Sequence, residues 1–462
     1  MNVSSETGTS ASSAPARARQ ASRFPRLLAW LEPPPSIPPE TTDPRQVAAA
    51  YRHWRREILL WTLLGYSVFY FVRKNLGIAM PAMQASLGLT KSELGLFLTL
   101  HGVIYGLSKF ANGFLGDRCN GRTFMVAGLI ASAVMNVGFG FSSSALAFGV
   151  FWMANGLFQG MGFAPCVRLM THWFAPRELA TKMSFWNTSH SIGASAVVVL
   201  CGYLVGWNWR LCFLVPAALA LFCSGLLLLR LRDRPESLGL PELPGTEAGV
   251  SETDAGVAGP NVPAWRAVFC NPYIWLLAAA NFFVYALRYA VLDWGPSLLH
   301  EYKGITLTHA GWMVAAFELS GISGMLLTGW LTDRFFDSRG ARVCVFCMAP
   351  AGLSLLLFWK LPVQSELGST ALLCGAGFWI YGPQSLVGIA VANLATKRAA
   401  ATAIGFTGLF GYASTVLSGW GLGALVQRHG WDAGFLGLVG LAAIGTLFFV
   451  AAWPAKAHGY RI

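Results

Sequence analysis

Twelve long apolar segments constrain the fold of this 462-residue chain more than any other feature. Each is close to the roughly 20 residues that a helix needs to cross a bilayer. Only 12% of the residues are charged, about half the share in a soluble domain, so the excess apolar surface is expected to face lipid. Because lipid offers no partner to an unpaired backbone group, we expect all twelve spans to be helices. Their approximate limits are 58–80, 94–115, 123–141, 145–169, 182–206, 210–229, 273–299, 308–331, 343–361, 369–394, 400–426 and 434–453.

The segments outside the spans divide the chain. Residues 1–50 are rich in Ser, Ala, Arg and Pro, a composition typical of disorder, and are expected to form a cytoplasmic tail. Six-helix bundles are expected at 51–230 and 269–454, joined by a cytoplasmic linker at 231–268, with a short cytoplasmic tail at 455–462. Basic residues are more frequent in the loops after even-numbered spans, which places those loops and both termini in the cytoplasm.

The two halves of the chain repeat one another. The segment Gly113-Phe-Leu-Gly-Asp117-Arg118 follows the second span, and Gly329-Trp-Leu-Thr-Asp333-Arg334 follows the eighth, 216 residues later. Arg73 in the first span and Arg288 in the seventh are 215 residues apart. This nearly constant offset indicates two pseudo-symmetric six-helix halves, as in secondary transporters. The repeated Asp-Arg pairs are expected either to form gating contacts on the cytoplasmic side or simply to solvate loops.

Six ionisable residues lie well inside the predicted spans. A charge at the centre of a bilayer costs at least about 2.5–3.5 kcal/mol, so each of them needs a reason. Four are basic and two are acidic, which leaves two positive charges that internal ion pairs cannot neutralise but a dianionic ligand can. They are Arg73, Lys74, Lys109, Arg288, Asp293 and Glu318.

Arg73 and Arg288 are expected to lie at one height, about 25 Å from the cytoplasmic end, facing each other across the interface between the halves. Two opposed guanidinium forks suit the tetrahedral oxygens of a phosphate. The alternative is that each arginine pairs with a carboxylate, Arg288 with Asp293 or Glu318.

The remaining polar residues allow two interpretations each. Lys109 faces the same cavity or extends toward the cytoplasm. Lys74 points about 100° away from Arg73 on a helix, so we expect it to pair with an acid, with Glu318 as the candidate. His190 contacts ligand or is a hydrogen-bonded core residue. Tyrosine hydroxyls at similar depths either line a polar cavity or serve packing; they belong to Tyr66, Tyr70, Tyr105, Tyr285, Tyr381 and Tyr412.

Several motifs give the chain a family resemblance. The repeated Gly-x-Leu-x-Asp-Arg loops resemble the signature of the major facilitator superfamily. Within it, the chain resembles the organophosphate:phosphate antiporter family from about Tyr51 to the end of the twelfth span. The motifs are Tyr70-Phe-Val-Arg73-Lys74-Asn75, Tyr105-Gly-Leu-Ser-Lys109-Phe110, Trp186-Asn187-Thr-Ser-His190, Tyr285-Ala-Leu-Arg288-Tyr289, Leu292-Asp293-Trp294 and Gly405-Phe-Thr-Gly-Leu-Phe-Gly-Tyr412.

The resemblance implies a function. It implies that Arg73 and Arg288 grip a phosphoryl group, that Lys109 and His190 join them, and that Asn187 lies in the substrate-binding set. It also implies exchange of an organophosphate, such as glycerol-3-phosphate or a hexose 6-phosphate, for inorganic phosphate in the bacterial inner membrane. The alternative is a membrane sensor of external sugar phosphate that signals to a partner histidine kinase.

Other classes of protein are not expected. No catalytic constellation and no ATP-binding loop accompany the intramembrane charges, so we expect neither an enzyme nor a cofactor. Cys344 and Cys347 form a CxxC pair, but nothing completes a zinc site. The basic excess fits cytoplasmic loops and does not indicate nucleic-acid binding. We expect the chain to function as a monomer in the bilayer.

Overall fold

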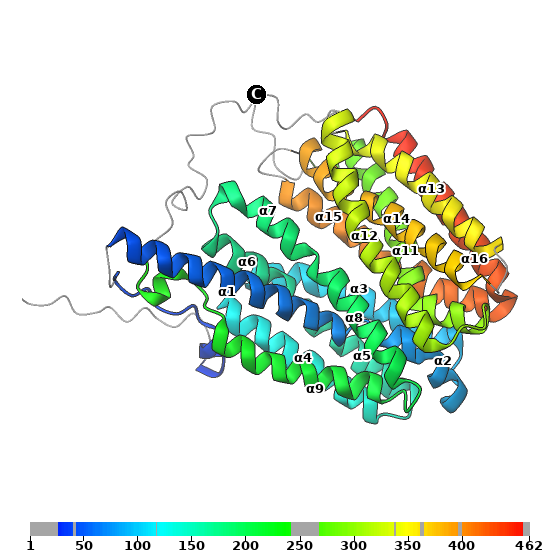
Figure 1. The fold of residues 1–462 in the computed structure, drawn as a ribbon, viewed down its shortest axis with the longest axis horizontal. Helices are drawn as coiled ribbons and strands as arrows, with labels where there is room; N and C mark the ends of the chain where they lie inside the picture. The colour runs from blue at the N-terminus through cyan, green and yellow to red at the C-terminus, as the bar shows by residue number, and fades with distance from the viewer. Residues whose placement is uncertain are drawn as a thin grey trace, which may run out of the picture.

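The computed structural model describes residues 26–39, 43–116, 118–241, 268–336, 339–360, 365–395 and 400–455. All regular secondary structure in these ranges is helical, which confirms the all-α fold expected from the sequence. The helices form two bundles, one for each half of the chain (Figure 1).

The N-terminal half contains nine of the helices. They are α1 (Pro44–Phe71), α2 (Leu76–Leu87), α3 (Lys91–Gly116), α4 (Gly121–Phe141), α5 (Ala145–Gln159), α6 (Phe163–Trp173), α7 (Pro176–Asn187), α8 (Ser189–Leu204) and α9 (Leu211–Arg230). Short 3-10 helices precede and follow them, η1 (Arg26–Leu31) and η2 (Pro235–Leu238).

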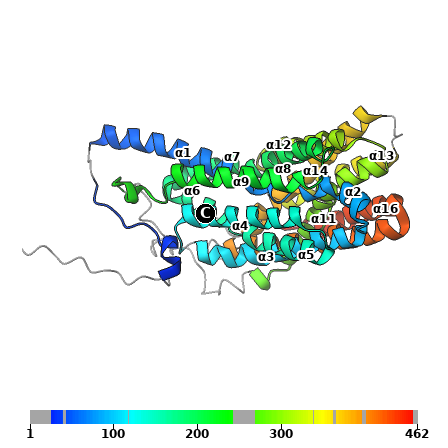
Figure 2. The same ribbon diagram turned by 90° about the horizontal axis from the view of Figure 1, so that it is seen from below.

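Longer helices make up the C-terminal half. They are α11 (Pro272–Glu301), α12 (Leu307–Phe335), α13 (Gly340–Lys360), α14 (Glu366–Leu394), α15 (Ala400–Ala413), the π-helical turn η4 (Val416–Gly421) and α16 (Leu422–Ala451). The path of α16 changes direction at Gly430, whose φ of 77° is a left-handed conformation that favours glycine. Figure 2 shows the same two bundles from below.

The helices account for the predicted spans unequally. Eight helical stretches in the described residues are long and apolar enough to cross a membrane, and one of them, Thr402–Ala451, holds the last two predicted spans. The predicted spans 58–80, 145–169 and 182–206 are each divided between two helices. The chain is therefore a multi-pass helical membrane protein, while the count of twelve spans stays a prediction.

Part of the N-terminal segment 1–50, which was expected to be disordered, is folded. Helix α1 begins at Pro44, inside the region expected to be a tail. Leu31 in η1 is buried against Cys119 and Phe124, and its carbonyl accepts a hydrogen bond from the backbone N–H of Asn120 at 2.7 Å. Apolar burial and backbone pairing thus hold residues 26–39, which the Pro-rich composition did not predict. The rest of that tail, residues 1–25 and 40–42, lies outside the described residues.

The start of the expected linker also packs on the N-terminal half. Asp233 is buried, and its Oδ1 accepts a hydrogen bond from the Gly121 amide at the start of α4 at 2.6 Å. The other oxygen, Oδ2, lies 3.4 Å from Arg168 Nη2. The Asp233 carboxylate thus binds both the N-terminus of α4 and the buried Arg168. Residues 231–241 are therefore part of the bundle rather than a free linker. Residues 242–267 and 456–462 lie outside the description.

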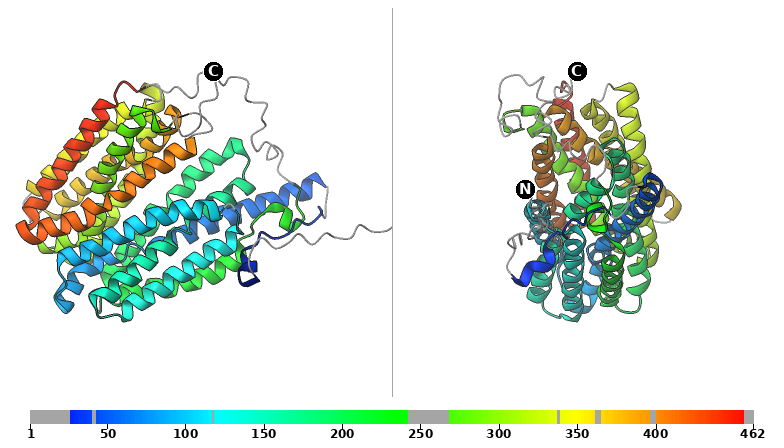
Figure 3. Two further views of the ribbon diagram at one scale, coloured as in Figure 1. Left: turned by 180° about the vertical axis from the view of Figure 1, so that it is seen from behind. Right: turned by 90° about the vertical axis from the view of Figure 1, so that its left-hand side faces the viewer.

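The two halves meet at one end and diverge toward the other (Figure 1; Figure 3, left). At the meeting end, Thr99 Oγ1 donates to the Thr415 carbonyl at 2.7 Å and Thr308 Oγ1 donates to the Gly202 carbonyl at 2.9 Å. Lys91 Nζ closes the rim with an ion pair to Glu301 Oε2 at 2.9 Å. Lys91 and Glu301 border loops that follow odd-numbered spans. Among the described residues, the hydrogen bonds between the halves all lie between this rim and the level of Lys109.

Candidate functional site

A break between α1 and α2 positions the first arginine. Helix α1 ends at Phe71 and α2 begins at Leu76, so Arg73 and Lys74 lie in a non-helical turn inside a predicted span. Such a break leaves carbonyl oxygens without helical partners, and lipid cannot supply any. The Val72 carbonyl instead accepts hydrogen bonds from two buried asparagine side chains, at 2.9 and 2.8 Å from Asn136 and Asn155.

Neighbouring amides complete the support of this turn. Gln159 Nε2 donates to the Phe69 carbonyl at 3.1 Å, and Asn75 Nδ2 donates to the Cys212 carbonyl at 2.8 Å. These hydrogen bonds tie the turn to α4, α5 and α9, so the positions of Arg73 and Lys74 are determined by the bundle. We did not predict a role for these amides from the sequence, although polar amides inside apolar spans were the available signal.

Arg73 is a buried cation that is paired with rings instead of acids. Its side chain is 7% exposed, and its guanidinium carbon lies 3.8 Å from the centre of the Tyr105 ring and 5.2 Å from that of Tyr70. Within the described part of the chain, no carboxylate lies within ion-pair distance of it. Cation–π contacts stabilise the charge without neutralising it, so Arg73 can still bind an anion.

Arg288 has a different environment. It lies in the middle of α11, 3% exposed, and its Nε donates to the Tyr381 hydroxyl at 2.7 Å. Its Nη2 lies 3.4 Å from Glu318 Oε1, and the Tyr381 hydroxyl donates to the same carboxylate oxygen. Of the alternatives for Arg288, the structure therefore shows the carboxylate pair, with Glu318 as the partner. The two arginines occupy corresponding places in the repeat, but only one is neutralised.

Three rings connect the two arginines. The Tyr70 ring contacts Arg73, and the centre of the His190 ring lies 6.0 Å from that of Tyr70. On its other side, His190 lies 6.2 Å from Tyr381, whose ring is 4.7 Å from the Arg288 guanidinium carbon. His190 therefore lies at the interface of the halves, between the two arginines.

Lys109 is the second cation of this site for which the described residues supply no carboxylate within ion-pair distance. Its Nζ lies 3.2 Å from the Tyr412 hydroxyl and 4.0 Å from the centre of the Phe163 ring. The Tyr412 ring packs edge-on against Tyr105 at 4.9 Å and lies 6.0 Å from Tyr285. Tyr105 also contacts the Arg73 guanidinium. The pair Tyr105 and Tyr412 therefore links both unneutralised cations, Arg73 and Lys109.

Lys74 pairs with Asp293 and not with Glu318, so our expectation for its partner was wrong. The two charged atoms, Nζ and Oδ1, lie 2.6 Å apart across the interface between the halves. The physical reason is the helix break, because a side chain in a turn does not follow the 100° step of a continuous helix. Lys74 Nζ also lies 4.6 Å from the ring of Tyr289, a residue that we did not select although it follows Arg288 directly.

The charges of the site leave a surplus. Four basic side chains, Arg73, Lys74, Lys109 and Arg288, converge at the interface of the halves, and the two carboxylates neutralise only Lys74 and Arg288. Arg73 and Lys109 supply the two remaining positive charges. The arrangement is therefore suited to a dianion that replaces the missing acids.

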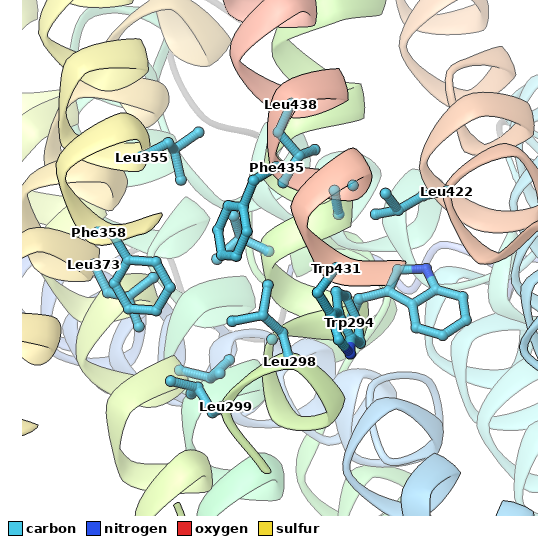
Figure 4. Close-up of a pocket in the computed structure, with 15 residues that line it drawn as sticks. Trp294, Leu298, Leu299, Leu355, Phe358, Leu373, Leu422, Trp431, Phe435 and Leu438 are labelled. Atoms are coloured by element: carbon cyan, nitrogen blue, oxygen red, sulfur yellow. The ribbon is translucent and has the colours of Figure 1, made fainter. Parts of the chain in front are cut away.

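A small polar cavity adjoins the site. It measures about 20 Å³, room for about one water molecule, and its lining includes Arg73, Lys74, His101, Tyr289 and Asp293. An apolar cavity of similar size lies within the C-terminal half, and its lining comes from α11, α12, α13, α14 and α16 (Figure 4). Its tryptophan, phenylalanine and leucine side chains offer no charge for an anion, so it is packing space.

The remaining predicted residues lie at the edge of this cluster, away from it or outside the described residues. Tyr66 packs on Tyr70 at 5.7 Å and lies beside Tyr105, so it is at the edge of the cluster, and it also packs on Trp186 at 4.8 Å. Asn187 is half-buried at the end of α7. For the expected gating pairs, Asp117 and the side chain of Asp333 are not among the described residues, while Arg118 and Arg334 are exposed.

Known proteins resemble this chain over most of its length. Residues 62–419 match the family model described as Major Facilitator Superfamily. The chain is 38% identical to the "Membrane sensor protein UhpC" of Salmonella typhimurium, over 94% of this chain and 100% of the relative. It is 37% identical to the "Glycerol-3-phosphate transporter" of Bacillus subtilis, over 92% and 98%. It is 38% identical to the "Probable hexose phosphate transport protein" of Chlamydia muridarum, over 93% and 97%.

Proposed function

Because the chain belongs to the major facilitator superfamily of membrane transporters, we propose that it exchanges an organophosphate for inorganic phosphate by alternating access. Two of its relatives carry names of phosphate-ester transporters, one for glycerol-3-phosphate and one for hexose phosphate. These names support a small phosphate ester as the substrate class and the inner membrane of a bacterium as the location.

The observation that carries this proposal is the pair of unneutralised cations. Arg73 lies on the Tyr105 ring and Lys109 beside Tyr412, which packs against Tyr105, and neither cation has a carboxylate within ion-pair distance in the described part of the chain. Burying such charges is costly unless a partner arrives. A phosphate ester carries close to two negative charges at neutral pH, which matches the surplus.

The geometry supports a division of labour between the cations. The planar fork of Arg73 suits bidentate contact with two phosphoryl oxygens, while the Lys109 ammonium acts as a point charge. Arg288 is held by Tyr381 and Glu318, so binding of the phosphoryl group exchanges an internal acid for the ligand. His190, between Tyr70 and Tyr381, can donate to the same group from the interface.

The arrangement of the halves supports alternating access. They meet at the rim of Lys91 and Glu301 and diverge toward the other end (Figure 1). We place the diverging end, with the basic loops after even-numbered spans and both termini, in the cytoplasm. The structure then corresponds to the cytoplasm-open state, and transport requires the rim to open after the cytoplasmic ends close. One chain supplies the whole site, so a monomer suffices.

The relative named as a membrane sensor gives a second candidate function. A sensor would bind sugar phosphate with the same charges and pass the signal to a partner histidine kinase instead of moving the ligand. The two relatives named as transporters favour transport.

Exchange in proteoliposomes tests the proposal. Vesicles containing the purified chain and loaded with phosphate should take up external radiolabelled phosphate much faster than unloaded vesicles. External glycerol-3-phosphate or glucose 6-phosphate should compete with that uptake. Equal initial uptake by loaded and unloaded vesicles would mean uniport or proton symport. Ligand binding without uptake in either case would support the sensor.

A further inference from the structure

An apolar groove lies on the outer surface of the N-terminal half. It has a volume of about 390 Å³ and is lined by Trp30 of η1, Leu228 of α9 and one face of α4. The α4 residues recur every three or four positions, so they form a single stripe along the helix. They are Thr123, Val126, Ala127, Ile130 and Ala131.

The groove is open to the surroundings of the helices. Ile130 is 38% exposed, Leu228 41% and Trp30 50%, and both α4 and α9 are apolar enough to cross a membrane. In such a chain these side chains face lipid acyl groups and not water. The groove therefore has the shape and the surroundings of an acyl-chain site.

Contacts of the neighbouring Leu31 hold Trp30 in place at the groove. Leu31 is buried beside Cys119 and Phe124, and its carbonyl accepts a hydrogen bond from the backbone N–H of Asn120 at 2.7 Å. Figure 3 shows this short helix, in dark blue, at the end of the N-terminal half. Tryptophan favours the interface between acyl chains and headgroups, and that is where the ends of α4 and α9 place it.

The same end of the groove is positively charged. Helix α4 begins at Gly121, so Arg122 precedes the groove stripe directly, and Arg232 follows the end of α9. The Arg122 Nε is buried and lacks a hydrogen-bond partner among the described residues. Burial and the nearby Arg122 both lower the pKa of Arg232, because each of them disfavours its positive charge.

Two acids near this end of the groove, Asp233 and Glu57, are paired with other basic residues. Asp233 binds Arg168 and Arg234, each at 3.4 Å, and Glu57 lies 3.7 Å from Arg230. Within the described residues, neither Arg122 nor Arg232 has a carboxylate at ion-pair distance. Arg232 is held by backbone carbonyls, at 2.9 Å from Leu229 and 2.8 Å from Leu231, and lies over the Trp54 ring at 5.2 Å.

We propose that this groove binds an anionic phospholipid, with an acyl chain along the α4 stripe beside Trp30 and the headgroup phosphate at Arg122 and Arg232. The charge of the mouth and the apolar lining select a molecule that has both an anion and a hydrocarbon chain. On the cytoplasmic leaflet, where we place these loops, anionic lipids are attracted by clustered basic residues.

Lipid titration of the full chain in detergent tests the site. Phosphatidylglycerol and phosphatidylcholine with the same acyl chains are compared by native mass spectrometry. Each arginine near a headgroup raises the affinity for an anionic lipid by about fivefold. The wild type should therefore bind phosphatidylglycerol more tightly than phosphatidylcholine by about one to two orders of magnitude. Arg122→Gln with Arg232→Gln should remove this preference, whereas Arg45→Gln, at an exposed arginine outside the groove, should leave it unchanged.

A second variant separates the two parts of the site. Trp30→Ala removes part of the apolar wall. It should weaken the binding of both lipids by a similar factor and leave the ratio of their affinities unchanged. Equal binding of the two lipids by the wild type, or a preference that survives the double arginine substitution, would overturn the proposal. So would displacement of phosphatidylglycerol by inorganic phosphate alone, since the mouth would then bind a free anion without an acyl chain.

Discussion

Lys74 and Asp293 form a buried ion pair, 2.6 Å between Nζ and Oδ1, that joins the two halves at the level of the helix break. The lysine comes from the turn between α1 and α2, and the aspartate comes from α11. Their side chains are 8% and 13% exposed. The pair therefore connects the arginine-bearing turn of one half to the arginine-bearing helix of the other.

Removing one partner should destabilise the protein strongly. Asp293→Asn leaves the Lys74 ammonium buried beside Arg73, and breaking a buried pair in this way costs about 3–5 kcal/mol. We expect a large drop in the thermal unfolding midpoint in detergent. The double variant Lys74→Met with Asp293→Leu removes both charges and should recover most of the loss. A single variant as stable as the wild type would show that the pair is solvated and unimportant for folding.

Replacing either arginine by lysine should weaken phosphate binding, although the charge is kept. Lysine lacks the planar fork, and at Arg73 it also loses the stack on the Tyr105 ring at 3.8 Å. Losing one charged hydrogen bond corresponds to a reduction of about 10–100-fold in affinity. Binding isotherms of Arg73→Lys and Arg288→Lys measure it, and near-normal exchange by either variant would remove that arginine from the clamp.

The sequence predicted the charge surplus of the site because it depends only on residue type and depth. Arg73 and Arg288 share a depth since the repeat offset is nearly constant, and the count of acids near them follows from the sequence. The difference between the two arginines did not follow. Whether Glu318 reaches Arg288 or Lys74 depends on how α12 packs against α11, which helical periodicity does not specify.

The break at residues 72–75 explains the other missed features. The hydropathy pattern predicts one span at 58–80 because the residues on both sides of the turn are apolar. The turn is possible only because Asn136 and Asn155, distant in sequence, donate to the Val72 carbonyl. The ordered residues 26–39 were missed for a related reason, since Leu31 gains its burial from Phe124 and not from local sequence.

Neutralising Glu318 should tighten the binding of phosphate. Glu318→Gln keeps an oxygen that can accept from Tyr381 but removes the charge that competes with ligand for Arg288. Three cations rather than two then lack a carboxylate, so the dissociation constant should fall while release, and therefore turnover, slows. Calorimetry and exchange rates measure the two effects. Weaker binding in this variant would assign Glu318 to positioning Arg288.

Phosphate binding should depend on the protonation of His190. A protonated imidazole between Tyr70 and Tyr381 adds positive charge toward the phosphoryl group, so affinity should be higher at low pH and fall as pH rises through its titration. The ligand titrates near pH 6 as well, so the informative quantity is the difference between wild type and His190→Gln. Identical pH profiles of the two proteins would make His190 a core residue.

Weakening the rim at the meeting end of the halves should shift the protein toward a state that is open on that side. Lys91 Nζ pairs with Glu301 Oε2 at 2.9 Å, and the same oxygen accepts from Trp431 Nε1 at 3.0 Å. The pair is partly exposed, so its contribution should be near the upper end of about 0.2–1 kcal/mol, which corresponds to a change of about twofold to fivefold in the population of the rim-open state.

Spin labels at the two sides of the rim measure this shift. Ser86 at the end of α2 and Arg428 in α16 are exposed, and cysteines at these positions, with the exposed Cys270 replaced by serine, report the distance between the halves. Glu301→Gln should increase the long-distance population, because the carboxylate no longer draws Lys91 across the gap. Glu366→Gln is the matched control, since it breaks an exposed pair with His309 that joins two helices of one half at 3.0 Å. If both variants give the wild-type distance distribution, the rim is closed by packing at Thr99 and Gly419 alone, and the ion pair does not gate it.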